Sequence, residues 1–434
     1  MLINNKIPMV IIFVALSIFV GASVSAIGVK SLYIIPVIIL MMVVPKLTKD
    51  AGKISIIGIL FFLPFQNVLV FDVGLFSLKM SQIFLFIGLL YLFMTKQLSN
   101  QMVPVMLVVP ILMSLFNSID INRSVTLLFA VILLIGMYIV IRDIARISKK
   151  ETILKVIIWS GVISSLYGIY QYIGFYMGID TGIHYYVWDP RPKVNSFSVP
   201  NQFSNFLLLP IAVSMYAIKV YGKKYILPLL ICSSALVLTF STGAIISLVL
   251  SVIIYALIVS KTMRRVSLGL GAILFVITSI AYIADPGIFN LNKYQGFIDG
   301  RTTERILLWD VATKMFLEHP IVGSGLNTFP LHAVYEITYL TFERNKEVHN
   351  TFLTVLAELG IVGMLFFGTA VGFIFFQAIR RIKHTTGEQR ILVSCLLIAS
   401  LTMLIQYFTD NGLYSMHLWA TFALLKVYSE KVAN

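Results

Sequence analysis

Apolar residues occupy long blocks along the chain, and short polar stretches separate the blocks. A helix takes about 20 residues to cross the hydrocarbon core of a bilayer, and helices and closed barrels are the structures that can span it. We therefore expect about 12–14 transmembrane helices in an all-α bundle, because several blocks are short. The predicted spans lie near residues 7–27, 31–45, 54–70, 80–95, 102–116, 124–141, 153–178, 202–218, 225–240, 243–260, 267–284, 351–379, 391–408 and 411–428.

The composition agrees with this pattern. Hydrophobic residues make up 59% of the chain and charged residues only 12%, with a mean hydropathy of +0.93. A soluble domain carries roughly a quarter charged residues, so the chain is predicted to be an integral membrane protein. Cys232 and Cys395 both lie inside apolar blocks, where we interpret them as packing residues rather than as a disulfide or metal pair.

The net charge of +14 is explained by its distribution. If the N-terminus is cytoplasmic, most of the 33 Lys and Arg residues fall in the inside segments, as the positive-inside rule requires. The basic excess therefore indicates orientation rather than binding to nucleic acid. Both termini are expected to be cytoplasmic.

Two outer segments differ from the short basic loops inside. The first is rich in aromatic residues and proline, and the second is by far the longest loop. Because the inside loops are too short for a catalytic domain, any chemistry is expected at the outer face. The chain is thus divided into N-terminal spans (1–178), an outer segment (179–201), central spans (202–284), a long outer loop (285–350) and C-terminal spans (351–434).

The long loop contains one predicted helix, "RTTERILLWDVATKMFLEHP". Thr302 or Thr303 could serve as its N-cap, and Pro320 lies beyond its end. Arg305 precedes Trp309 by four residues, and Arg301 precedes Arg305 by four, so the three side chains share one face.

A glycine-rich turn follows this helix, in the stretch "PIVGSGLNTF". Gly323 and Gly325 form a G-x-G pattern that is too short and too common to indicate a nucleotide site. A tight turn is the favoured interpretation.

The stretch "EVHNTFLTVLAELGIVG" starts with charge and becomes apolar at Thr351. Asn350 can cap the helix that begins there, since its side chain can accept from a free backbone N–H of the first turn. His349 then lies directly before the helix, at the outer boundary of the membrane. The positive end of the helix dipole disfavours imidazolium and so favours a neutral ring that can accept a proton.

Glu358 lies inside the apolar part of the same helix. It should be roughly 13 Å deeper than His349 and on the opposite side, so the two are not expected to touch. A carboxylate in a span is costly and usually faces the bundle interior, and we favour a structural hydrogen bond over a catalytic role. Gly360 and Gly363 would allow a neighbouring helix to approach closely.

No metal site is predicted. The six histidines, His184, His319, His332, His349, His384 and His417, show no ligand spacing. The outer arginines are a better candidate, because a guanidinium group offers a fixed fork of donors that matches phosphate oxygens. Arg191, Arg301 and Arg305 lie on the two sizeable outer segments.

Three ordered stretches, "RPKVNSFSVPNQFSNFL", "ERILLWDVATKMFLEHPIVGSGLNTF" and "VHNTFLTVLAELGIVGML", resemble the O-antigen ligase and O-antigen polymerase superfamily. Its hallmark is an Arg-x3-Trp helix, then Pro-x2-Gly-x-Gly, then His-Asn and Glu-x-Gly-x2-Gly. The matching positions here are Arg305 and Trp309, Pro320, Gly323 and Gly325, His349 and Asn350, and Glu358, Gly360 and Gly363.

The resemblance implies a bacterial enzyme of the cytoplasmic membrane that works at the outer face. It would transfer a glycan from undecaprenyl diphosphate to an acceptor hydroxyl without a cofactor, a metal or a nucleotide sugar. By the same resemblance, Arg191 and Arg305 would hold the diphosphate and His349 would act on the acceptor hydroxyl. Arg301 and Asn350 are further candidates for substrate contact, whereas the tryptophan, glycines and Glu358 are expected to be structural.

One position departs from the superfamily. Its members often carry Ser-Arg-Gly after a central span, whereas this chain has "LTFSTGAII", with Thr242 in place of the arginine. The role of that arginine is therefore either absent or taken by another residue such as Arg301.

The motifs do not distinguish a polymerase, whose acceptor is another repeat unit, from a ligase, whose acceptor is lipid A core or another end acceptor. We favour a polymerase slightly, because it needs only a sugar on a second carrier lipid. A transporter or flippase for lipid-linked saccharide is the rival from another class. It is disfavoured because no internal repeat is visible and the polar residues gather at one face. A scaffold protein is a weaker alternative, since it would not require these arginines and a histidine.

Overall fold

The computed structural model describes residues 50–259, 295–336 and 346–430, apart from short gaps at 66–67, 69, 74–75, 100–101, 183–185 and 188–191. The described part is almost entirely helical, so the predicted all-α membrane architecture is confirmed. Before residue 260 the elements are α3 (Ala51–Phe61), β1 (Val70–Val73), β2 (Phe76–Lys79), α4 (Met80–Thr95), α5 (Met102–Leu115), α6 (Ile121–Ile147), α7 (Lys150–Met177), β3 (Tyr186–Val187), β4 (Pro192–Lys193), α8 (Pro200–Tyr221), the 3-10 turn η2 (Lys223–Tyr225), α9 (Ile226–Leu238) and α10 (Thr242–Val259). After it come α12 (Gln295–Glu318), α13 (Phe329–Glu336), α14 (Thr351–His384), α15 (Gly387–Gln406) and α16 (Met416–Ser429).

Within the described residues, five helices are long and apolar enough to cross a membrane, namely α6, α7, α8, α14 and α15. Shorter apolar helices are α3, α4, α5 and the first part of α10, Thr242–Ser251. The spans predicted near residues 7–27, 31–45 and 267–284 lie outside the described residues. The predicted total number of spans and the division into five segments therefore stay predictions.

The predicted span at 54–70 is wrong in its second half. Helix α3 ends at Phe61, and Pro64 follows shortly after, where proline disfavours helical backbone in the residue before it. Strands β1 and β2 follow instead and pair antiparallel, with Val70 of β1 opposite Lys79 of β2. The last predicted span also starts too early, because residues 407–415 form a loop before α16.

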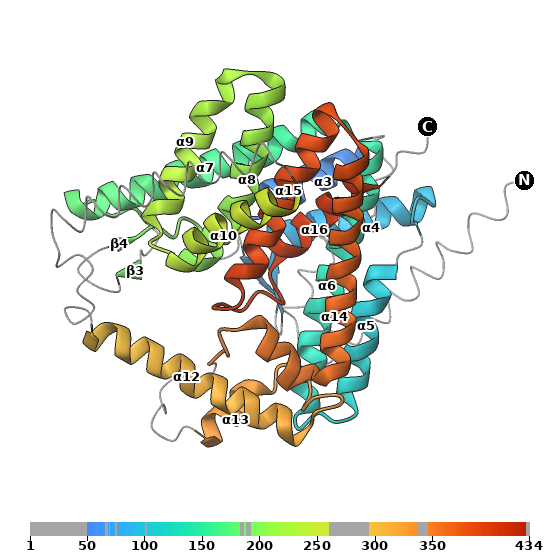
Figure 1. The fold of residues 1–434 in the computed structure, drawn as a ribbon, viewed down its shortest axis with the longest axis vertical. Helices are drawn as coiled ribbons and strands as arrows, with labels where there is room; N and C mark the ends of the chain where they lie inside the picture. The colour runs from blue at the N-terminus through green and yellow to red at the C-terminus, as the bar shows by residue number, and fades with distance from the viewer. Residues whose placement is uncertain are drawn as a thin grey trace, which may run out of the picture.

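Helix α12 crosses the end of the bundle where α14 begins (Figure 1). Helices α5, α6 and α14 run side by side, and α12 lies across their ends with α13 next to it. The predicted N-caps Thr302 and Thr303 are wrong, because α12 already starts at Gln295 and both threonines lie inside it. The predicted stop before Pro320 is confirmed, since α12 ends at Glu318.

A network of ion pairs ties α6 to α16 at the opposite end of the bundle. Arg142, which is 7% exposed, pairs with Glu430 at 2.7 Å and with Asp143 at 3.1 Å. Arg146 also pairs with Glu430. Because removing one partner of a buried pair leaves an uncompensated charge, this network keeps the far ends of the two helices together.

Candidate active site where helix α14 begins

Helix α14 is broken at Gly360, whose backbone adopts φ 66° and ψ −167°. On the N-terminal side of the break, two carbonyl groups lose their hydrogen-bond partners within the helix. The backbone N–H of Ser324 donates to the carbonyl of Ala357 at 3.1 Å, and that of Gly325 donates to the carbonyl of Glu358 at 3.1 Å. The glycine-rich turn thus supplies donors that the helix itself no longer provides.

The same turn also accepts hydrogen bonds from the C-terminal side of the break. Ile361 donates its backbone N–H to the carbonyl of Pro320 at 2.9 Å, and Val362 donates to the carbonyl of Ile321 at 3.1 Å. Buried backbone groups are nearly always paired, and inside a membrane an unpaired one costs several kcal/mol. Residues 320–325 are therefore inserted into α14. The glycine-rich turn and the Glu-x-Gly-x2-Gly motif of α14 thus form one structural unit.

Glycine is required on both sides of this contact. A Cβ atom at Gly323 would overlap the carbonyl group of Glu358, and one at Gly360 would overlap the carbonyl of Ile321. Both glycines also have positive φ, 74° and 66°. The prediction that Gly360 lets a neighbouring helix approach is wrong, because the element that comes close is the loop.

Glu358 is 3% exposed and makes hydrogen bonds within the protein. Its Oε2 accepts from the hydroxyl of Tyr414 at 3.0 Å, and its Oε1 accepts from the backbone N–H of Phe329 at 3.4 Å. A further backbone hydrogen bond comes from Asn327. The carboxylate thus connects α14 with the start of α13 and with the loop before α16, and His349 is not among these hydrogen-bond partners.

The turn between α5 and α6 supports the inserted loop from its other side. Asn117 donates to the carbonyl of Gly323 at 3.1 Å and lies 3.1 Å from Nδ1 of His319. The backbone N–H of Ile119 donates to the carbonyl of Ser324 at 3.3 Å. The side chain of Ser124 donates to the carbonyl of Leu326 at 2.7 Å. These contacts fix the position of the loop that follows α12.

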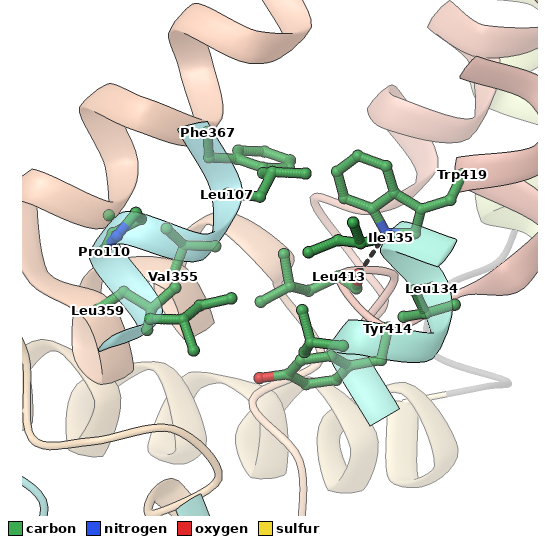
Figure 2. A pocket seen from close by; sticks show the side chains of 13 residues that line it. Leu107, Pro110, Leu134, Ile135, Val355, Leu359, Phe367, Leu413, Tyr414 and Trp419 are labelled. Atoms are coloured by element: carbon green, nitrogen blue, oxygen red, sulfur yellow. Dashed lines mark hydrogen bonds between the residues drawn. The ribbon is translucent and has the colours of Figure 1, made fainter. Parts of the chain in front are cut away.

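An apolar cavity of about 30 Å³ lies between α5, α6, α14 and α16, beside the break (Figure 2). Val355 and Leu359 line it on the α14 side, and Leu413, Tyr414 and Trp419 line it from the last loop and helix. The indole N–H of Trp419 donates to the carbonyl of Leu413 at 2.8 Å. A cavity this small and apolar is a packing gap rather than a site for a lipid chain.

Helix α12 is attached to the residues just before His349. The indole N–H of Trp309 donates to the carbonyl of Val348 at 3.0 Å, and Lys346 pairs with Glu304 at 2.6 Å. Arg305 lies one turn before Trp309 on the same face and is half-buried. Trp309 therefore places the arginine-bearing face of α12 next to the His349 segment.

The other two predicted arginines are less well defined. Arg301 belongs to α12, two turns before Trp309, and its side chain is not described. Arg191 lies outside the described residues. Their predicted roles in diphosphate binding stay predictions.

Asn350 is the N-cap of α14, as predicted. Its side-chain oxygen accepts from the backbone N–H groups of Phe352 at 3.0 Å and Leu353 at 3.1 Å. His349 precedes this cap and has a positive φ of 52°, which is uncommon for a residue other than glycine. Such backbone strain clusters at functional sites, and here it turns His349 out of the helix direction.

The imidazole of His349 faces a carboxylate. Its Nδ1 lies 3.8 Å from Oδ1 of Asp410, which belongs to the loop between α15 and α16. The His349 side chain is 39% exposed, whereas that of Asp410 is 14% exposed. A proton on Nδ1 would point at the carboxylate and leave Nε2 as the acceptor. At 3.8 Å the two atoms lie beyond hydrogen-bond distance, and Nδ1 has no hydrogen-bond partner among the described residues, so the carboxylate acts on the ring through its charge.

A second carboxylate lies close to His349. Protein surrounding Glu347 raises the pKa of its carboxyl group, although the residue keeps an exposed surface, and the charge of Asp410 adds to this effect. The charge of His349 and a hydrogen bond from Asn411 act in the opposite direction and lower the pKa. The histidine thus has two acidic groups in its surroundings.

Thr242 also belongs to this end of the bundle. It is the exposed first residue of α10, and a Cβ on the next residue, Gly243, would lie 3.1 Å from Oγ1 of Thr409. The position where the superfamily often has an arginine is therefore next to the loop that carries Asp410.

No group of three or more His, Cys, Asp or Glu side chains with metal-binding geometry occurs among the described residues.

Sequence reasoning missed Asp410, Glu347, Asn117 and Tyr414. Asp410 had a usable signal, because "TDNG" is a polar stretch between two predicted spans at the same face as His349. The hydrogen bonds of Asn117 and Tyr414 connect residues far apart in sequence and leave no local pattern. One group of predicted residues comes together where α14 begins: His349, Asn350, Arg305 and Trp309. A second group forms the unit of the inserted loop and the break in α14: Gly323, Gly325, Glu358 and Gly360.

The fold and this site define the class of the protein: a helical, membrane-spanning protein with acid, base and arginine side chains gathered at one end of its bundle. Residues 227–368 match the model of the family described as O-Antigen ligase. The match runs from α9 into α14 and includes Arg305, Trp309 and His349. The match covers less than half of the chain and supports the O-antigen ligase and polymerase superfamily predicted from the motifs. A search of curated proteins found no match.

Proposed function

We propose that the chain is a membrane glycosyltransferase that moves a glycan from undecaprenyl diphosphate to an acceptor sugar hydroxyl at the outer face of the bacterial cytoplasmic membrane. The family match supports ligase- or polymerase-type function in general. The observation that carries the finer proposal is the pairing of His349 with Asp410 beside the arginine-bearing face of α12.

In the proposed reaction, Nε2 of His349 takes the proton from the acceptor hydroxyl. The acceptor oxygen then forms a bond to the anomeric carbon of the donor glycan, while the bond from that carbon to the diphosphate oxygen breaks. Asp410, opposite Nδ1, stabilises the imidazolium that results. A base held this way contributes typically 10²–10⁴-fold in rate.

The diphosphate leaving group gains charge as the glycosidic bond breaks. Arg305 is the best-placed described residue to stabilise this charge, because it lies on the face of α12 that Trp309 fixes beside Val348. Fixed cations that meet charge developing in the transition state accelerate the reaction more than they strengthen ground-state binding. Arg191 and Arg301 are proposed to assist Arg305.

The broken helix α14 is the one observation that favours a transporter, since transporters often bind their substrates at discontinuous helices. In those proteins the free backbone groups bind the ligand. Here residues 320–325 of the chain itself occupy the backbone groups of the break. The break is thus a structural joint, and glycosyl transfer remains the better proposal.

Purified protein in detergent tests this proposal, because transport has no meaning there whereas transfer does. With undecaprenyl-diphosphate-linked glycan and an acceptor, we expect product without added metal or nucleotide sugar. No product from donor and acceptor that are processed in native membranes would contradict the proposal. Gel analysis of a deletion strain separates the two activities: single-repeat products indicate a missing polymerase, and long chains left on the carrier indicate a missing ligase.

Arg305 is tested in the same assay. Arg305→Ala should lower kcat/KM for the donor by about 10–100-fold, because a hydrogen bond to a charged group contributes about 1.5–3 kcal/mol. Lys314→Ala is the matched control, since Lys314 lies nine residues further along α12, on the opposite face, and pairs with Asp310 one turn earlier in the same helix. An unchanged turnover at limiting donor in Arg305→Ala would remove this residue from the donor site.

A further inference from the structure

We propose that Thr351 is a positioning residue that holds Asp410 opposite His349. The inference rests on the proposed function, because it gives Thr351 a role through the carboxylate that supports the catalytic histidine. Thr351 is two residues after His349 and is the first residue of α14. It is fully buried, at 0% exposure, and so does not itself meet the substrate.

Thr351 makes three hydrogen bonds to the loop that carries Asp410. Its backbone N–H donates to the carbonyl of Tyr407 at 2.9 Å. Its hydroxyl donates to the carbonyl of Asp410 at 3.1 Å and accepts from the backbone N–H of Gly412 at 2.7 Å. The residue thus contacts the loop before, at and after the carboxylate-bearing position.

These bonds differ from what a threonine in a first helical turn usually makes. The hydroxyl of Thr354, one turn later, donates to the carbonyl of Asn350 at 2.9 Å and stays within its own helix. The backbone N–H of Thr351 would have no partner inside α14, because the first N–H groups of a helix are free. Its backbone N–H and its hydroxyl are instead bonded to the neighbouring loop.

The path from Thr351 to the histidine is short and rigid. Asn350 caps α14 and fixes the start of the helix, so His349 and Thr351 keep a constant separation. On the loop side, the backbone N–H of Asn411 donates to Oδ1 of Asp410 at 2.9 Å and aims the carboxylate. The hydroxyl of Thr351 therefore sets the distance between the two partners, which is 3.8 Å.

The loop has other attachments that remain without this hydroxyl. Phe408 stacks on Phe352 with ring centroids 4.2 Å apart, and Tyr414 donates to Glu358 at 3.0 Å. Replacing Thr351 with valine keeps the size and the backbone N–H but removes both hydroxyl bonds. The variant is therefore expected to fold, with the loop free to shift at Asp410 only.

The experiment is a double-mutant cycle on glycan transfer by the purified full-length protein. Thr351→Val should lower kcat on the order of tenfold, because the two hydroxyl hydrogen bonds that hold the loop at Asp410 are lost, while the donor KM stays within twofold. Thr351→Ser keeps the hydroxyl and should retain activity. Thr354→Val, at a buried threonine that bonds only its own helix, is the matched control and should behave as wild type.

The second arm uses Asp410→Asn, which keeps an oxygen for the N–H of Asn411 and should lower kcat. If Thr351 acts through Asp410, Thr351→Val should change kcat by less than twofold in this background. An equal loss in both backgrounds, or a Thr351→Val variant with wild-type kcat, would overturn the inference. An active His349→Ala variant would instead contradict the proposed function, so the two failures are distinguishable.

Discussion

The insertion of residues 320–325 into α14 makes a sharp prediction for Gly360→Ala. The backbone at this residue, with φ 66° and ψ −167°, lies in a region that is nearly exclusive to glycine. Forcing alanine into it costs about 1–3 kcal/mol. In addition, the new Cβ would overlap the carbonyl of Ile321, so the loop must move away.

Moving the loop breaks the two hydrogen bonds on the far side of the break, from Ile361 to Pro320 and from Val362 to Ile321. At about 0.5–1.5 kcal/mol each, they bring the expected loss of folding free energy for Gly360→Ala to about 2–6 kcal/mol. The site should suffer as well, because the inserted loop follows α12 and helps to hold Arg305 near His349.

Thermal unfolding of the purified protein in detergent measures this loss. Gly368→Ala is the matched control, since Gly368 lies in the same helix and a Cβ there meets nothing within 4 Å. At such a position alanine should stabilise the helix by roughly 0.5–1 kcal/mol. The two variants should therefore shift the Tm in opposite directions. Equal Tm values for Gly360→Ala and Gly368→Ala would refute the reasoning that the loop and the break form one unit.

Two further predictions concern the support of the site and its packing. Trp309→Phe removes the donor to the carbonyl of Val348 and should lower glycan transfer severalfold, since the lost bond contributes about 1 kcal/mol. Trp159→Phe, at a 55% exposed position, is the control and should have no effect. Equal effects of the two changes would contradict the role of Trp309. Val355→Ile reaches into the 30 Å³ cavity and should stabilise the protein by up to ~0.7 kcal/mol, at about 24 cal/mol per Å³ filled; a clear decrease in Tm would show that the cavity cannot accept a methyl group.

Much of the fold could be predicted from local sequence. The apolar blocks gave helices close to their observed bounds, as for α4, α7 and α8, because membrane helices must satisfy all their backbone groups internally. Asn350 was correctly predicted as the cap of α14, since capping depends on a single side chain and the next few backbone groups.

The break in α14 could not be predicted from the same patterns. Its apolar sequence continues through Gly360, and the groups that satisfy the broken hydrogen bonds are backbone atoms of a loop more than thirty residues away. Backbone partners of this kind leave no side-chain signature. The glycines did mark a close approach, but not which element approaches.

The pairing of His349 with Asp410 was missed for a related reason. The two residues are on different segments, and only the packing of α14 against α15 and α16 brings them together. The histidine was identified from its place before a helix and from the superfamily motif. The sequence signal for Asp410 was its position in a predicted outer loop.

The central claim is that His349 is the base for glycan transfer, and one measurement tests it most directly. Transfer from undecaprenyl-diphosphate-linked glycan is compared in detergent for wild type, His349→Ala and His384→Ala at matched protein amounts and thermal stability. His384 is the last residue of α14, at the end far from the site, and serves as the control. We expect that His349→Ala loses at least about 10²-fold in kcat while His384→Ala keeps wild-type activity. Wild-type transfer by a folded His349→Ala variant would contradict the role of His349 as the base.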